Sequence, residues 1–143
     1  MKKSIFALFL ALVILQCGIV PAFAEEPAVI QSNHVIVYYF CTNYTCPGCY
    51  NIEKWTKEVV DTDFKDDNTI GKIVFKKVCI YAKGNEHFME DYELCTDSVV
   101  LVLIKNDKEV KFTNLTRIWC NICCADVLKA YIKNAISEYL KEI

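Results

Sequence analysis

Three apolar runs along the chain have the composition of β-strands. Residues 34–40 and 73–81 are rich in β-branched and aromatic side chains. Residues 99–104 are apolar without interruption, which is typical of a strand buried on both faces of a sheet. The dipeptide Asn106-Asp107 then predicts a hairpin turn into a fourth strand at residues 109–112, whose alternating pattern indicates the edge of the sheet.

Two further stretches carry apolar residues at helical spacing. The first predicted helix begins at or just after Cys46 and ends between Val60 and Phe64. Its apolar face is formed by Ile52, Trp55, Val59 and Val60. The last helix of the chain also has a single apolar face, formed by Leu128, Ile132, Ala135, Ile136, Tyr139 and Ile143.

The segments between these elements complete the predicted order. Residues 61–71 are rich in turn-forming side chains and are expected to close the first helix. Asn85 is expected to cap a short helix from Glu86 to about Tyr92. The order is β-α-β, then α, then β-β-α, without repeats or a long linker. We therefore predict one α/β domain at residues 34–143: a four-stranded mixed sheet, flanked by helices, that begins with a right-handed parallel unit.

Residues 1–24 have the three parts of a secretory signal peptide. Lys2 and Lys3 form a basic end, residues 5–15 are apolar, and Ala22-Phe23-Ala24 is a small-x-small cleavage site. The alternative is an uncleaved membrane anchor, but the apolar part is short for a span. We expect cleavage near Ala24, an N-terminal arm at residues 25–33, and an extracytoplasmic location, either periplasmic or secreted.

Charge and cysteine content narrow the class of protein further. The chain has 16 basic and 18 acidic residues and a net charge of −2. Loss of the leader would take this to −4, because it removes two lysines and no acidic residue. Without a basic patch, nucleic acid is not an expected partner. Eight of the nine cysteines lie outside the leader, which suits a compartment where disulfides persist or thiols are deliberately kept reduced.

The stretch Cys46-Pro47-Gly48-Cys49 lies where the first strand leads into the first helix. Unpaired N–H groups and the helix dipole at this position favour a thiolate on Cys46. Cys49, one turn later, could attack a mixed disulfide formed by Cys46. Pro47 suits the first helical position, so that Gly48 and Cys49 are left to donate N–H groups to the sulfur. A structural disulfide or half of a zinc site are the alternatives.

This motif and the order of elements resemble the thioredoxin-like superfamily. The form Cys-Pro-x-Cys is that of its glutaredoxin- and DsbA-like members. Four segments are similar to small exported proteins of the ArsF family, known as nitrophenyl compound nitroreductase subunits: residues 37–40, 46–53, 87–92 and 98–102. The resemblance implies a thioredoxin-like fold and a thiol–disulfide oxidoreductase. No segment looks built to hold a flavin, and we expect no cofactor.

Two positions depart from the thioredoxin pattern. Thioredoxin-like proteins usually have a cis-proline just before the third strand, where this chain has Ser98 or Val99. We expect both to support the active site, together with Pro47 and Gly48. The buried aspartate of thioredoxin is also missing, because the first strand offers only Tyr38 and Tyr39. The sequence therefore names no proton acceptor for Cys49.

Six further cysteines are secondary thiol candidates. Three of them are expected at the end of the sheet next to Cys46: Cys41, Cys79 and Cys95. They could form a second thiol pair, bind a soft metal ion as thiolates, or be small buried hydrophobic residues. Cys120, Cys123 and Cys124 contain a second Cys-x-x-Cys before the last helix. We expect a local disulfide there, on a different part of the domain from Cys46. A redox relay or a soft-metal site is the alternative.

Three hypotheses follow. The first is an exported thiol–disulfide oxidoreductase with Cys46 as nucleophile and Cys49 as resolving thiol, and it assigns no metal ion. Its expected partners are protein or small-molecule thiols and disulfides, with a membrane thiol carrier as electron partner. The second hypothesis is a module that binds a soft metal or metalloid through clustered cysteines. The third is a disulfide-stapled interaction domain.

Overall fold

A four-stranded mixed sheet forms the centre of the computed structural model, which describes residues 32–44 and 46–143. The predicted signal peptide and most of the arm lie outside the described residues. The sheet order is β2-β1-β3-β4. β1 pairs in parallel with β2 and antiparallel with β3, and β4 pairs antiparallel with β3. The strands are β1 (His34–Cys41), β2 (Ile73–Cys79), β3 (Ser98–Lys105) and β4 (Lys108–Asn114).

Burial along the strands follows their place in the sheet. β1 and β3 are central and almost wholly buried, whereas nearly every residue of β4 is exposed at the edge. Alternate residues of a strand point to opposite faces. Val35, Val37 and Tyr39 therefore pack on one face, while Ile36 and Phe40 pack on the other. The predicted strands are confirmed. β1, β3 and β4 are one to three residues longer than predicted, and β2 ends at Cys79 instead of residue 81.

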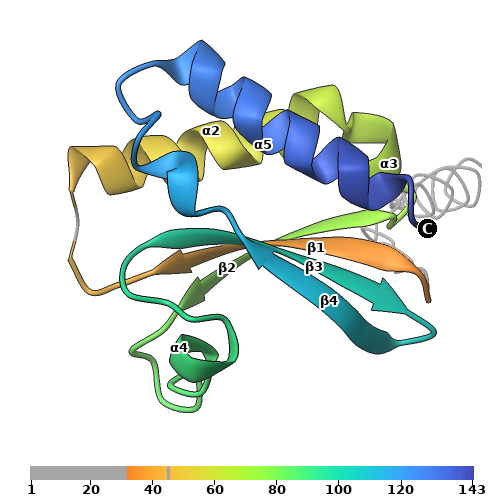
Figure 1. Ribbon diagram of the computed structural model, residues 1–143, viewed down its shortest axis with the longest axis horizontal. Helices are drawn as coiled ribbons and strands as arrows, with labels where there is room; N and C mark the ends of the chain where they lie inside the picture. Colours follow the sequence, from red (N-terminus) through yellow and green to blue (C-terminus); the bar gives the residue numbers. More distant parts are fainter. Residues whose placement is uncertain (1–31, 45) are drawn as a thin grey trace, which may run out of the picture.

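Helices cover both faces of the sheet, as the element order predicts (Figure 1). α2 (Pro47–Asp63) and α5 (Ala125–Leu140) pack side by side on one face, and the short α4 (Phe88–Asp91) lies on the other. α5 buries Leu128, Ile132 and Ile136 from its predicted apolar face. This single domain has the thioredoxin-like fold. Within the described residues, no helix is long and apolar enough to cross a lipid bilayer.

Two local predictions are wrong. The polar stretch after α2 is not only a turn, because residues Lys65–Thr69 form α3. Asp66 and Asp67 lie in the first turn of α3, where carboxylates interact favourably with the helix dipole. Asn85 does not cap a helix; its side-chain amide donates to the carbonyl of Cys79, and the helix α4 begins three residues later.

The predicted hairpin between β3 and β4 is confirmed. Asn106 and Asp107 have φ values of 51° and 60°. A two-residue hairpin turn with positive φ at both positions matches the right-handed twist of the strands, and Asn and Asp tolerate that conformation. The turn leaves β4 as the exposed edge of the sheet.

Candidate active site

Cys46 and Cys49 form a disulfide at the start of α2, with their Cα atoms 5.1 Å apart. Cys46 is the N-cap residue of the helix, with an extended backbone, and Pro47 occupies the first helical position. The N–H of Cys49 donates to the sulfur of Cys46 over 2.9 Å. Cys49 is buried, whereas Cys46 is half-buried. The sulfur of Cys46 is therefore the more accessible of the two and receives a helix-terminal N–H group.

The loop before α5 packs directly on this motif. A Cβ added to Gly48 would lie 2.4 Å from Cδ1 of Ile122 and 3.5 Å from the ring of Trp119. Glycine at position 48 thus allows the loop to approach α2 closely. This contact corrects the prediction that the second Cys-x-x-Cys lies on a different part of the domain.

No disulfide staples that loop, which is a second correction. Cys120, Cys123 and Cys124 are free, exposed thiols. The loop is held in other ways, since Trp119 Nε1 donates to the carbonyl of Asp97 over 3.0 Å and Ile122 packs against the core. Cys124 is the N-cap residue of α5, as Cys46 is of α2.

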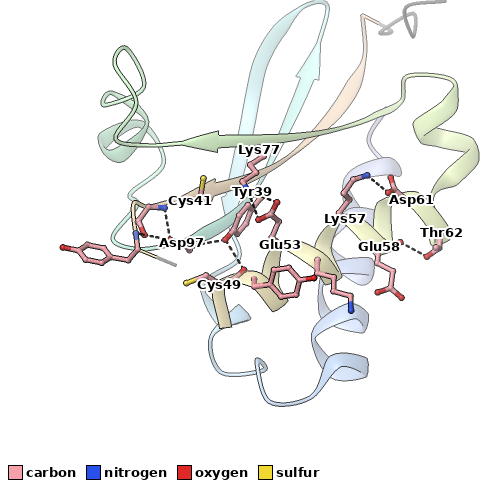
Figure 2. A pocket seen from close by; sticks show the side chains of 14 residues that line it. Tyr39, Cys41, Cys49, Glu53, Lys57, Glu58, Asp61, Thr62, Lys77 and Asp97 are labelled. Atoms are coloured by element: carbon pink, nitrogen blue, oxygen red, sulfur yellow. Dashed lines mark hydrogen bonds and ion pairs between the residues drawn. The ribbon is translucent and has the colours of Figure 1, made fainter. Parts of the chain in front are cut away.

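A buried carboxylate beside the motif was not predicted from the sequence. Asp97 is 2% exposed and lies in the loop that leads into β3. Its Oδ1 accepts from the N–H and the hydroxyl of Thr42 at 2.9 and 2.6 Å. Its Oδ2 lies 2.8 Å from the hydroxyl of Tyr39, which lies 3.1 Å from the carbonyl oxygen of Cys49 (Figure 2). Within the described residues, Asp97 is the one buried carboxylate.

The number of hydrogens in this network leaves room for Asp97 to accept a proton. The hydroxyl of Tyr39 has one hydrogen and faces two acceptor oxygens, the Asp97 carboxylate and the Cys49 carbonyl. If Asp97 takes up a proton, it can donate to Tyr39, and Tyr39 can then donate to Cys49. Both contacts become full hydrogen bonds in that state, so the network has room for one additional proton.

Tyr39 itself stays neutral and acts as a donor. Burial raises its pKa far above the ordinary value, and the hydrogen bond to Asp97 raises it further. Tyr39 is 1% exposed and packs on the face of the sheet that α2 covers. Tyr39 therefore connects the loop before β3 to the first turn of α2 without carrying charge.

Replacing Tyr39 with phenylalanine tests this connection. We expect Tyr39→Phe to lower the free energy of unfolding by about 1–3 kcal/mol, because a buried carboxylate oxygen loses its donor. Urea denaturation would measure the change. Tyr38→Phe is the matched control, since its ring lies on the opposite face of the same strand. An equal loss in both variants would contradict the role of the Tyr39 hydroxyl.

Ser98 and Val99 occupy the place where the resemblance implies a cis-proline. No peptide bond among the described residues is cis. The Ser98 hydroxyl donates to the carbonyl of Thr96, and the Val99 side chain is buried in the core. The Val99 carbonyl accepts from the N–H of Leu115. Both residues thus have structural contacts at the start of β3.

A pocket of about 800 Å³ extends from the disulfide along α2 toward the edge strand β2 (Figure 2). Tyr39, Asp97 and Cys49 line one end. Charged side chains of both signs line the rest and pair with one another, as in Glu53–Lys77 at 2.8 Å and Lys57–Asp61 at 2.5 Å. Three lysines and four carboxylates line the pocket, so its formal net charge is only −1 and does not select a strongly charged ligand.

The remaining predicted cysteines occupy two places. Cys41 and Cys79 end two paired strands and are both half-buried, while Cys95 is exposed in the loop before β3. In the part of the chain that the structure describes, no group of three or more His, Cys, Asp or Glu side chains is arranged to hold a metal ion. The soft-metal hypothesis therefore lacks a three-ligand centre among these residues.

Comparisons with known proteins find similarity at the level of structure alone. No protein-family model and no curated protein matches the chain. Thioredoxin of Fasciola hepatica is 20% identical with a TM-score of 0.45, and the match covers 74% of this chain and 81% of that one. Thioredoxin of Malassezia sympodialis is 17% identical with a TM-score of 0.46, over 79% and 80%. Reduced Schistosoma mansoni thioredoxin pre-protein is 20% identical with a TM-score of 0.39, over 71% and 82%. The assignment of the fold depends on the strand order and helix placement described above.

Proposed function

We propose that this protein is a thiol–disulfide oxidoreductase whose redox centre is the pair Cys46 and Cys49. The observation that carries the proposal is the Cys46–Cys49 disulfide at the N-terminus of a 17-residue helix, with a backbone N–H on the outer sulfur. A structural staple would not need an accessible sulfur at a helix N-cap. Thiolate chemistry does need it, because the helix terminus stabilises the negative charge.

In the reduced protein, the Cys46 thiolate attacks one sulfur of a substrate disulfide. A mixed disulfide forms, and the other substrate sulfur leaves as a thiolate. The Cys49 thiolate then attacks the sulfur of Cys46. The Cys46–Cys49 disulfide forms and the second substrate thiol leaves, so the substrate gains two electrons and the protein loses two. Substrate oxidation is the reverse sequence.

Asp97 is the proton acceptor that we propose for the resolving step. Cys49 must lose its proton before it can attack, and its sulfur is buried away from bulk water. Asp97 lies in the same pocket, and its hydrogen-bond network has room for one proton. General acid–base catalysis by a positioned group contributes about 10²- to 10⁴-fold in rate.

We also propose that the protein works outside the cytoplasm, as the signal-like pattern of residues 1–24 favours. Protein or small-molecule disulfides are then the substrates, and a membrane thiol carrier is the electron partner. The four motifs that resemble the ArsF family support membership of that family of small exported proteins. None of these points is needed for the chemistry at Cys46.

The experiment that tests the proposal is the pH dependence of Cys46 alkylation in the reduced protein, beside its equilibrium with glutathione. We expect the alkylation rate to reach half its maximum well below the pH of about 8.5 that is typical of a free cysteine. We also expect the Cys46–Cys49 disulfide to form and break reversibly. Alkylation typical of an ordinary thiol would contradict the proposal, and protection that is lost on adding a chelator would favour the metal-binding hypothesis.

A further inference from the structure

Cys41 and Cys79 are direct neighbours at the ends of two parallel strands. Cys41 is the last residue of β1 and pairs in register with Cys79, the last residue of β2. Residues opposite each other in a sheet point to the same face. Neighbouring strands are about 4.8 Å apart, within the range of about 4.4–6.8 Å that Cα atoms span in disulfides.

Each thiol also lies close to a group that is one or two residues away from the other cysteine. Sγ of Cys41 lies 3.5 Å from the carbonyl oxygen of Val78, the residue before Cys79. Sγ of Cys79 lies 3.6 Å from Oδ1 of Asn43, two residues after Cys41. The backbone is fixed beside them, since the N–H of Ile80 donates to the carbonyl of Cys41 over 3.0 Å. The two side chains thus lie next to one another at the same end of the sheet.

From this geometry we infer that Cys41 and Cys79 form a second redox-active dithiol, separate from the pair Cys46 and Cys49. The co-reactant is a low-molecular-weight disulfide such as glutathione disulfide. One thiolate of the pair attacks the small disulfide and releases one small thiol. The second thiolate attacks the resulting mixed disulfide and releases another. The Cys41–Cys79 bond forms, the pair loses two electrons and two protons, and the small disulfide becomes two thiols.

The surroundings of Cys41 predict that this pair exchanges with disulfides more slowly than Cys46 does. Burial raises the pKa of the Cys41 thiol, and the neighbouring Cys79 thiol raises it further, while Lys77 opposes the shift. A smaller thiolate fraction lowers the rate of exchange at neutral pH. The pair is not isolated, however, because Cys41 lines the same pocket as Cys49.

Oxidation of Cys41 and Cys79 also affects the Cys46–Cys49 site, through the segment that follows Cys41. Thr42 follows Cys41 directly and holds the Asp97 carboxylate with its N–H and hydroxyl. A Cys41–Cys79 bond ties the segment that carries Thr42 to β2. The redox state of the second pair is thereby coupled to the position of Asp97, beside Cys49.

The test is a redox titration of a variant in which the exposed thiols Cys95, Cys120, Cys123 and Cys124 are replaced by serine. Glutathione disulfide is the probe, and free thiols are alkylated before digestion and mass spectrometry. Cleavage after Tyr44 separates Cys41 from Cys46, so linked peptides identify the pairing. We expect a Cys41–Cys79 peptide and two protein disulfides per chain at full oxidation, against one when Cys41→Ser is added.

Two results would overturn the inference. One is that Cys41 and Cys79 remain open to alkylation at potentials where Cys46 and Cys49 are fully oxidised. The other is that Cys79 is found linked to Cys46 or Cys49 instead. A variant carrying Cys46→Ser and Cys49→Ser separates the two sites, since the Cys41–Cys79 bond should still form in it even if the proposed function fails.

Discussion

Replacing Cys46 with serine is expected to lower the rate of disulfide exchange by at least about a hundredfold. A serine hydroxyl is not ionised at neutral pH and cannot form a mixed disulfide, so the first step is lost. Cys49 does not substitute, because this residue is only 8% exposed and lies buried in the first turn of α2. Reduction of a small model disulfide by the full chain, with dithiothreitol as the electron source, would measure the loss.

Cys124→Ser is the matched control for this prediction. Cys124 is also an N-cap cysteine, at the start of the 16-residue helix α5, and its thiol is free and exposed. We expect this variant to keep the exchange rate within about twofold of the unmodified protein. Disulfide exchange requires the pair Cys46 and Cys49, and a thiol at a helix N-cap is not sufficient by itself. Full activity in Cys46→Ser together with loss in Cys124→Ser would place the reactive site at α5.

Asp97→Asn is expected to slow the resolving step about ten- to a hundredfold and to leave the first attack unchanged. Asparagine has the shape of a protonated aspartate: its oxygen can accept from Thr42, and its amide can donate to Tyr39. The hydrogen bonds of the network are thus retained while the proton acceptor is removed. Quenched reactions analysed by mass spectrometry should show a mixed disulfide on Cys46 that accumulates in the variant.

The pH profile separates this role from a structural one. If Asp97 accepts the proton of Cys49, added base should recover the rate of the variant as Cys49 ionises without help. Asp126→Asn, in the first turn of the other long helix, should change neither step. Equal slowing of both steps at every pH would mean that Asp97 only maintains the local structure.

The local sequence pattern was sufficient to predict most elements of the fold. The apolar run that became β3 predicted a strand buried on both faces, and positive-φ residues at Asn106 and Asp107 form the expected turn. The helix boundary at Cys46 could also be predicted, because a proline at the first helical position and an apolar face after it are local signals. Segment 61–71 was harder, since its residues suit both a turn and the short helix α3.

Asp97, the proton acceptor that we propose, could not be predicted from its local sequence. Asp97 is 48 residues beyond Cys49 in the chain, in a loop where an aspartate is ordinarily solvated. Its only sequence signal is its position directly before the buried strand β3. Tyr39 and Thr42, at the end of β1 and just after it, and Trp119, in the loop before α5, enclose Asp97 and place it at the site.

The sequence by itself determined the elements, their order and the Cys-x-x-Cys at a helix N-terminus, because periodicity, turn residues and caps act over a few neighbouring positions. Only the tertiary structure decided which distant groups meet. It placed Asp97 and Tyr39 beside Cys49, packed Ile122 on Gly48, and brought Cys41 into register with Cys79. Those contacts depend on how strands pair and how helices cover the sheet, and the pairing is set by burial summed over the whole domain.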